Sequence, residues 1–106
     1  MKNVETIHVT EEELYLPEKA DLIFMRNVCH HLRNRVEYFR KLRHFLKPYG
    51  KVAIIEHSKP IHVIFKHYVP KEIIVKEMEE AGFIVEQEFD FLPNQYFIIF
   101  RLKQIE

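Results

Sequence analysis

Apolar residues recur with two different periods along this chain, and the change of period separates its elements. The run Ala20 to Met25 (ADLIFM) is continuously apolar after Asp21, which is typical of a strand covered on both faces of a parallel sheet. Lys51 to Glu56 (KVAIIE) has the same character. The β-branched, partly alternating segment Val4 to Val9 (VETIHV) predicts a further short strand.

Between the two buried strands the spacing changes to that of a helix. Asn34 is followed three residues later by Glu37, which predicts a capping box at a helix N-terminus. Lys47-Pro48 should end the helix and Gly50 should permit the turn into the next strand. The resulting strand, helix and strand predict a βαβ unit with a right-handed crossover. The apolar stripe of this helix repeats every three or four residues and consists of Val36, Phe39, Leu42, Phe45 and Leu46.

The next segment, Pro60 to Val69, alternates as a strand would but also fits an irregular connector. Pro70 to Ala81 predicts a second helix, with proline in its first turn and Gly82 as its left-handed stop. Its inward stripe should comprise Ile73, Ile74, Met78 and Ala81.

A predicted hairpin follows the second helix. From Ile84 to Phe91, the residues Val85, Phe89 and Phe91 fall on one face and acidic residues on the other. Pro93-Asn94 then turns the chain into the antiparallel segment Gln95 to Lys103. The centre of that segment, YFIIF, is apolar on both faces, so we expect it inside the sheet and the charged strand nearer the edge.

Composition narrows the class of protein. The 106 residues leave room for one domain, and 47% hydrophobic and 13% aromatic residues favour a packed interior. Sixteen basic and sixteen acidic side chains are interspersed and cancel, which argues against a nucleic-acid partner. The apolar runs are too short for a membrane helix and no signal peptide opens the chain, so we expect a cytoplasmic protein.

Several short motifs, in order, resemble the second half of a class I S-adenosylmethionine-dependent methyltransferase. They are Asp21-Leu22-Ile23-Phe24, a crest with paired histidines at Asn27 to Leu32, Leu46-Lys47-Pro48-Tyr49-Gly50, Ala81-Gly82-Phe83 and Phe91-Leu92-Pro93. The resemblance implies an α/β fold, namely a partial Rossmann-like methyltransferase sheet of the three-layer type with a C-terminal antiparallel β-hairpin. It implies one domain over residues 1–106 and favours the connector reading of the segment before Pro70.

The family's glycine-rich turn, which lets a helix N-terminus approach the cofactor, has no counterpart here. The only glycines are Gly50 and Gly82. The resemblance therefore implies a fragment of an S-adenosylmethionine-dependent small-molecule methyltransferase, inactive alone. A cofactor of about 27 heavy atoms at roughly −0.3 kcal/mol per atom binds near micromolar, and half its contacts give about millimolar. The alternative is a non-catalytic homo-oligomeric assembly module derived from that fold.

The resemblance also assigns cofactor-side residues. Glu12, five residues before Pro17, is similar to the family's adenine-side acceptor, with Glu11 as its competitor. Arg26, Asn27 and Val28 would border the methionine end of S-adenosylmethionine.

His30, His31 and Glu56 would lie near the acceptor pocket, at the carboxyl ends of the strands. Either histidine is a candidate catalytic base, with an ordinary pKa near 6.5, and the competing interpretation is a strand-end side chain hydrogen-bonded to backbone. The histidine spacings do not favour a metal site. Cys29 is better explained as a small buried hydrophobe than as a nucleophile.

In the family the fourth strand has the first strand beside it. Without that neighbour, Leu22 to Met25 would present an unpaired apolar edge, which favours pairing with another chain. We therefore expect a homodimer, or a complex with a complementary N-terminal half. The alternative is that the segment Val4 to Val9 folds back and covers this edge.

Overall fold

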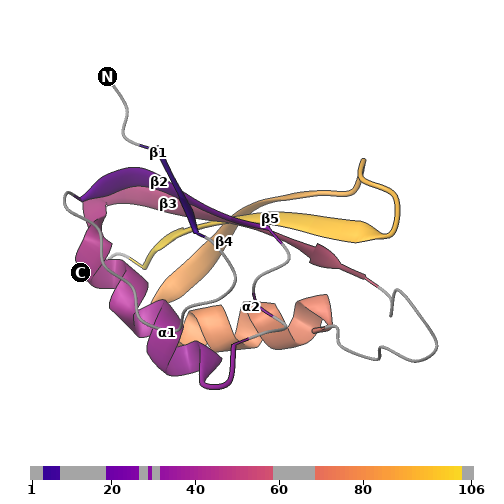
Figure 1. The fold of residues 1–106 in the computed structure, drawn as a ribbon, viewed down its shortest axis with the longest axis horizontal. Helices are drawn as coiled ribbons and strands as arrows, with labels where there is room; N and C mark the ends of the chain where they lie inside the picture. Colours follow the sequence, from indigo (N-terminus) through magenta and orange to yellow (C-terminus); the bar gives the residue numbers. More distant parts are fainter. Residues whose placement is uncertain (1–3, 8–18, 27–28, 30–31, 59–68, 104–106) are drawn as a thin grey trace.

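The computed structural model of the chain describes residues 4–7, 19–26, 29, 32–58 and 69–103. These residues form one five-stranded sheet in the order β1-β2-β3-β5-β4 with two α-helices, α1 and α2. The first three strands are parallel and comprise β1 (Val4–Ile7), β2 (Ala20–Arg26) and β3 (Leu46–His57). The hairpin strands β4 (Phe83–Phe89) and β5 (Gln95–Leu102) are antiparallel, and β5 lies between β3 and β4 (Figure 1).

The sheet confirms the strand predictions, with one correction at its first edge. β1 pairs in parallel with β2, with Val4 opposite Leu22 and Ile7 opposite Met25. The predicted unpaired edge at Leu22 to Met25 is therefore wrong, and the alternative, in which the N-terminal segment covers it, holds for Val4–Ile7. A nearby extended segment satisfies the backbone groups of that edge within the same chain.

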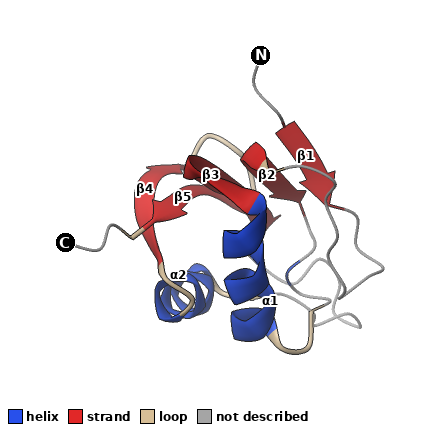
Figure 2. Ribbon diagram, turned by 90° about the vertical axis from the view of Figure 1, so that its left-hand side faces the viewer, coloured by secondary structure: helices blue, strands red, loops and turns tan. Residues whose placement is uncertain are grey.

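Both helices pack on the same face of the sheet (Figure 2). α1 (Arg35–Leu42) buries Tyr38, Phe39 and Leu42, and α2 (Lys71–Glu80) buries Ile74 and Met78. The described residues thus make a sheet layer and one helical layer. The core between these layers receives alternate side chains from the central strands, and its strand members include Ile23, Met25, Val52, Ile54, Ile98 and Phe100.

The first helix differs from its prediction at both ends. Asn34 is the N-cap residue, but its side chain makes no cap hydrogen bond, and Glu37 instead pairs with Arg40 at 2.6 Å. The helix ends at Leu42, a 3-10 turn (Arg43–Phe45) follows, and Lys47 and Pro48 already belong to β3. Proline and the residue before it favour extended backbone, so the same residues that exclude a helix begin the strand.

The second helix matches its prediction closely. Pro70 is the N-cap residue, Ala81 is the C-cap residue and Gly82 has φ +99°, the left-handed conformation that a helix stop requires. One member of the predicted stripe is wrong, because Ile73 is 43% exposed. No helix in the described ranges is long and apolar enough to cross a membrane.

In the hairpin, the charged strand β4 is the edge strand and β5 is internal, as predicted. The predicted single face of Val85, Phe89 and Phe91 is interrupted, because the pairing of β4 with β5 shifts between Val85 and Gln87. Val85 packs against the helix-side core, whereas Phe89 lies opposite Phe97. A bulge of this kind moves the following side chains to the other face. The segment before Pro70 lies mostly outside the described residues.

Candidate active site

The carboxyl ends of β2 and β3 and the start of β5 meet at one edge of the sheet. Arg26 ends β2 beside Ile55, and the last residues of β3, Glu56 and His57, pair with Tyr96 and Gln95. In open α/β sheets ligands bind outside this carboxyl-end edge. This edge is therefore the candidate ligand-binding region of the sheet.

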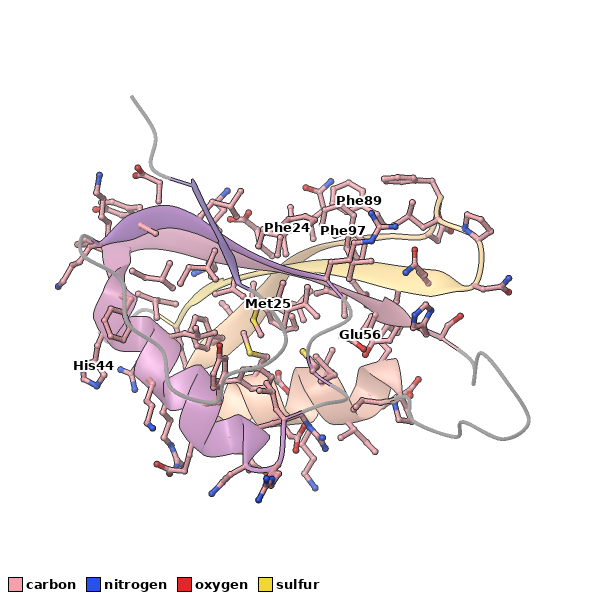
Figure 3. The ribbon with its side chains drawn as sticks, viewed as in Figure 1. Phe24, Met25, His44, Glu56, Phe89 and Phe97 are labelled. Atoms are coloured by element: carbon pink, nitrogen blue, oxygen red, sulfur yellow. The ribbon has the colours of Figure 1, made fainter. Side chains whose placement is uncertain are left out.

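Glu56 is the central side chain at this edge. It is 0% exposed, and its Oε2 accepts a hydrogen bond from the backbone N–H of Cys29 at 2.8 Å. Figure 3 shows Glu56 on the side of the sheet that faces the helices. This hydrogen bond joins the end of β3 to Cys29, which lies three residues after the end of β2.

Cys29 is buried and free of any disulfide. Burial, and secondly the Glu56 carboxyl group, raise the pKa of its thiol well above the ordinary value. A thiol in this state carries little thiolate and is a poor nucleophile. The structure confirms the interpretation of Cys29 as a small buried hydrophobe.

Tyr96 lies opposite Glu56 on β5. Its hydroxyl donates a 2.6 Å hydrogen bond to the backbone carbonyl of Val69, next to the start of α2. Burial raises the pKa of this phenol, with further contributions from Cys29 and Glu56. Tyr96 therefore remains a neutral donor that anchors the entry to α2 at the same edge.

An ion pair braces the other side of the crest. Arg35 Nε lies 2.6 Å from Glu77 Oε1, which ties the first residue of α1 to α2. Arg35 Nη1 also donates to the carbonyl of Leu32 at 3.4 Å, and the N–H of Leu32 donates to the carbonyl of Cys29 at 3.1 Å. Cys29 and Leu32, two described residues between β2 and α1, are thus held by Glu56 of β3 and, through Arg35, by α1 and α2.

A pocket of about 370 Å³ opens beside this edge, between the start of α2 and the end of the hairpin. Lys71 and Glu88 lie in its wall, 3.4 Å apart, as do Gln95 and Tyr96. The volume is near the lower end of the range for small-molecule sites.

The structure places only some of the residues assigned from the sequence. Arg26 is exposed at the end of β2, and Glu56 is buried beside the crest. The other assigned residues lie outside the described ranges and stay predictions; they are Glu12, Asn27, Val28, His30 and His31.

Sequence reasoning missed the anchoring contacts of this edge. The bond from Tyr96 to Val69 and the Arg35–Glu77 pair join positions 27 and 42 residues apart, so no local pattern reveals them. A signal existed only for Tyr96, the second residue of the internal hairpin strand, which lies opposite the end of β3.

A mixed sheet with three parallel strands, a closing antiparallel hairpin and a braced edge at the carboxyl ends defines a Rossmann-like methyltransferase fold. The family model described as "Methyltransferase domain" matches residues 1–54, just over half of the chain. The chain belongs to this family of methyltransferase domains, which confirms the resemblance.

Solved structures agree on the fold. A SAM-dependent methyltransferase from Aquifex aeolicus has a TM-score of 0.75 at 20% identity over 91% of this chain. An S-adenosylmethionine-dependent methyltransferase from Mesorhizobium loti gives 0.67 at 16% identity over 85%, and the pyocyanin biosynthetic protein PhzM gives 0.69 at 18% over 82%. These matches cover 53%, 65% and 32% of the respective longer proteins. No curated protein matches the chain.

Proposed function

We propose that this chain is the acceptor-side half of an S-adenosylmethionine-dependent small-molecule methyltransferase, and that a first half, on another chain or in a longer reading frame, completes it. Family membership and fold support a methyltransferase assignment. The 53% and 65% of the relatives' length that the chain covers support its being one part of such an enzyme.

The observation that carries this proposal is the hydrogen bond from the Cys29 N–H to Glu56. A buried carboxyl group is costly unless it is hydrogen-bonded, and here its partner is the backbone of the crest that carries His30 and His31. Methyl transfer depends mainly on holding the acceptor and the donor methyl group in line at near-attack distance. A backbone held at Cys29, beside the carboxyl ends of the strands, suits that task.

The described residues fit the acceptor side of such a site better than the donor side. Gly50 lies close to the carbonyl of Ala20, and Gly82 lies beside Arg43. Both positions are at the opposite edge of the sheet, where β2 begins and β4 begins, so neither glycine offers a close backbone approach to a cofactor at the carboxyl ends.

S-adenosylmethionine would supply a sulfonium-bound methyl group, and the chain's own residues would position its acceptor. We propose Glu12 on the adenine side and Arg26, Asn27 and Val28 at the methionine end. His30 or His31 would take the acceptor's proton. With only these contacts, we expect binding to the isolated chain to be near millimolar.

The test is a titration of labelled S-adenosylmethionine against the purified chain, alone and mixed with the polypeptide encoded directly upstream of Met1. We expect no saturation below about 100 micromolar alone and saturable binding in the mixture. Saturation below that level by the chain alone would refute its dependence on a first half. An upstream sequence without a glycine-rich cofactor turn would refute the half-enzyme assignment.

A matched pair of variants locates the adenine contact. In the saturable mixture, Glu12→Gln should weaken binding at least about tenfold, the loss expected for one strong hydrogen bond. Glu11→Gln, the same change one residue earlier, should leave binding unchanged. Equal effects of the two changes would remove Glu12 from the site.

The alternative, a non-catalytic assembly module, draws support from a different feature. The described residues leave one face of the sheet without a helix (Figure 2), and the register places Phe24, Ala53 and Ile99 side by side on that face.

A further inference from the structure

The pocket between the start of α2 and the end of the hairpin has walls of opposite charge. Lys71, the first residue of α2, lies in one wall, and Glu88 and Asp90, at the end of the charged hairpin strand, lie in the other. All three residues are exposed, so a ligand can reach them from solvent. We call this cavity of about 370 Å³ the hairpin pocket.

The geometry of the hairpin brings these side chains to one pocket. Glu88 and Asp90 are two residues apart, so extended backbone directs both of them to one face. The contact of Glu88 with Lys71 shows that this face is turned towards α2. Two buried residues of β5, Tyr96 and Ile98, contribute to the lining. The pocket therefore combines a buried base with charged walls that solvent reaches.

Contacts on both sides hold the walls before any ligand binds. The Tyr96 hydroxyl donates to the carbonyl of Val69 at 2.6 Å, two residues before Lys71, so β5 anchors the start of α2. On the other face of the hairpin, the ring centroids of Phe89 and Phe97 lie 4.9 Å apart (Figure 3). A site that is formed in advance loses less conformational entropy when a ligand binds.

The charged groups of the pocket keep unused binding capacity. Lys71 Nζ lies 3.4 Å from Glu88 Oε1, in a pair whose side chains are half-exposed. An ammonium group has three donors, so Lys71 can keep this contact and still bind a ligand carboxylate. Asp90 forms no hydrogen bond or ion pair with another described residue. The pocket thus offers a cationic donor and an unpaired carboxylate at once.

We propose that the hairpin pocket binds a small zwitterion, namely a free α-amino acid. The ligand carboxylate lies at Lys71 and the ligand ammonium group lies at Asp90. A ligand with a single charge uses one wall and leaves the charge of the other wall without a partner, so the two walls together select a molecule that carries both groups. The volume, near the lower end for small-molecule sites, suits an amino acid better than a peptide.

This inference does not depend on methyl transfer, because amino-acid binding is measured without S-adenosylmethionine. Its failure would leave the proposed function standing, and failure of the proposed function would leave the pocket. A ligand of about 12 non-hydrogen atoms, such as L-phenylalanine, should bind in the low-millimolar range.

Titration of L-phenylalanine into the full chain at physiological salt tests the proposal. We expect saturable shifts in the amide NMR signals of Phe89 and Gln95, which line the pocket. Two analogues each lack one charged group of the probe. Phenethylamine, without the carboxylate, and hydrocinnamate, without the ammonium group, should each bind at least about threefold more weakly, the loss expected for one partly exposed ion pair.

Two variants assign each ligand charge to its wall. Lys71→Met should weaken the binding of L-phenylalanine at least about threefold without weakening that of phenethylamine. Asp90→Asn should weaken the binding of L-phenylalanine by a similar factor without weakening that of hydrocinnamate. Glu86→Gln is the matched control, because Glu86 lies on the same strand but pairs with Lys51. It should leave all three affinities unchanged, since salt screens distant surface charges.

Three results would overturn the proposal. Absence of saturable shifts at Phe89 and Gln95 would remove the pocket as a binding site. Binding of either analogue as tightly as L-phenylalanine would show that the pocket does not recognise both charges. Loss of phenethylamine binding in Lys71→Met would contradict the assignment of the ligand carboxylate to that residue. The comparison of the three ligands uses the unaltered chain, so it decides the matter even if a variant fails to fold.

Discussion

Removing the Glu56 side chain should be among the most damaging single changes in this protein. The carboxyl group is fully buried and holds the Cys29 N–H at 2.8 Å. Glu56→Ala leaves that buried N–H without its acceptor, which costs about 1–3 kcal/mol. The volume it vacates adds a cavity term of about 1–2 kcal/mol.

The expected loss for Glu56→Ala is therefore about 2–5 kcal/mol, a large share of the roughly 5–15 kcal/mol that stabilises a domain. Glu56→Gln retains a carbonyl acceptor and nearly the same volume, so it should lose only about 1–2 kcal/mol. With a urea m-value of about 1.5 kcal/mol/M, the alanine change moves the midpoint down by roughly 2 M.

Urea unfolding followed by far-ultraviolet circular dichroism measures both variants. Glu88→Ala is the control, because Glu88 is a half-exposed glutamate paired with Lys71 at 3.4 Å, and such a surface pair contributes less than about 1 kcal/mol. Hydrogen exchange at the Cys29 amide reports the contact directly, and its protection should fall in Glu56→Ala. If Glu56→Ala were no less stable than Glu88→Ala, the Glu56 contact would not hold the crest.

Three further changes test other contacts. Because burial raises the pKa of the Cys29 thiol, the folded state keeps a proton that the unfolded state loses at alkaline pH. The free energy of unfolding should therefore fall as pH rises above about 8.5, and it should fall less in Cys29→Ala. A urea midpoint that rose over this pH range would contradict the prediction. Tyr96→Phe removes the hydroxyl bond to Val69 and should cost about 1–2 kcal/mol in urea unfolding, whereas an unchanged midpoint would mean that the bond contributes nothing. Gly82→Ala places a side chain at φ +99° and a Cβ 3.1 Å from the Arg43 guanidinium. Thermal unfolding should therefore show a loss of about 1–2 kcal/mol in the free energy of unfolding. Ala81→Gly is the control for the neighbouring helical position, and an unchanged stability of Gly82→Ala would be the contrary result.

The pattern of apolar residues predicted the strands and helices well where local chemistry alone determines the element. The continuous apolar runs of β2 and β3 and the stop at Gly82 follow directly from local chemistry. Local patterns were less informative where a residue is compatible with more than one structural role. Pro48 excludes a helix, and the structure uses it to start β3 early. Ile73 fits the helical stripe, yet its position on the turn leaves it 43% exposed.

The site was predictable by location but not by contact. Glu56 was expected at the carboxyl ends of the strands, and the structure places it at that edge, buried opposite Tyr96. Its bond to Cys29 spans 27 residues and depends on how two strand ends converge, which no sequence spacing encodes. The bulge after Val85 is similarly invisible, since the alternation of β4 reads smoothly through it.

The position of β5 has a consequence for how the chain acquires its structure. Among the described residues this strand comes last in the sequence, yet it lies inside the sheet between β3 and β4. During synthesis at about 5–20 residues per second, β3 and β4 both wait for residues 95–102 before either gains its neighbour there. The nascent protein thus carries an incomplete sheet until residues 95–102 arrive, and a protease that removed those residues would separate β4 from the parallel strands.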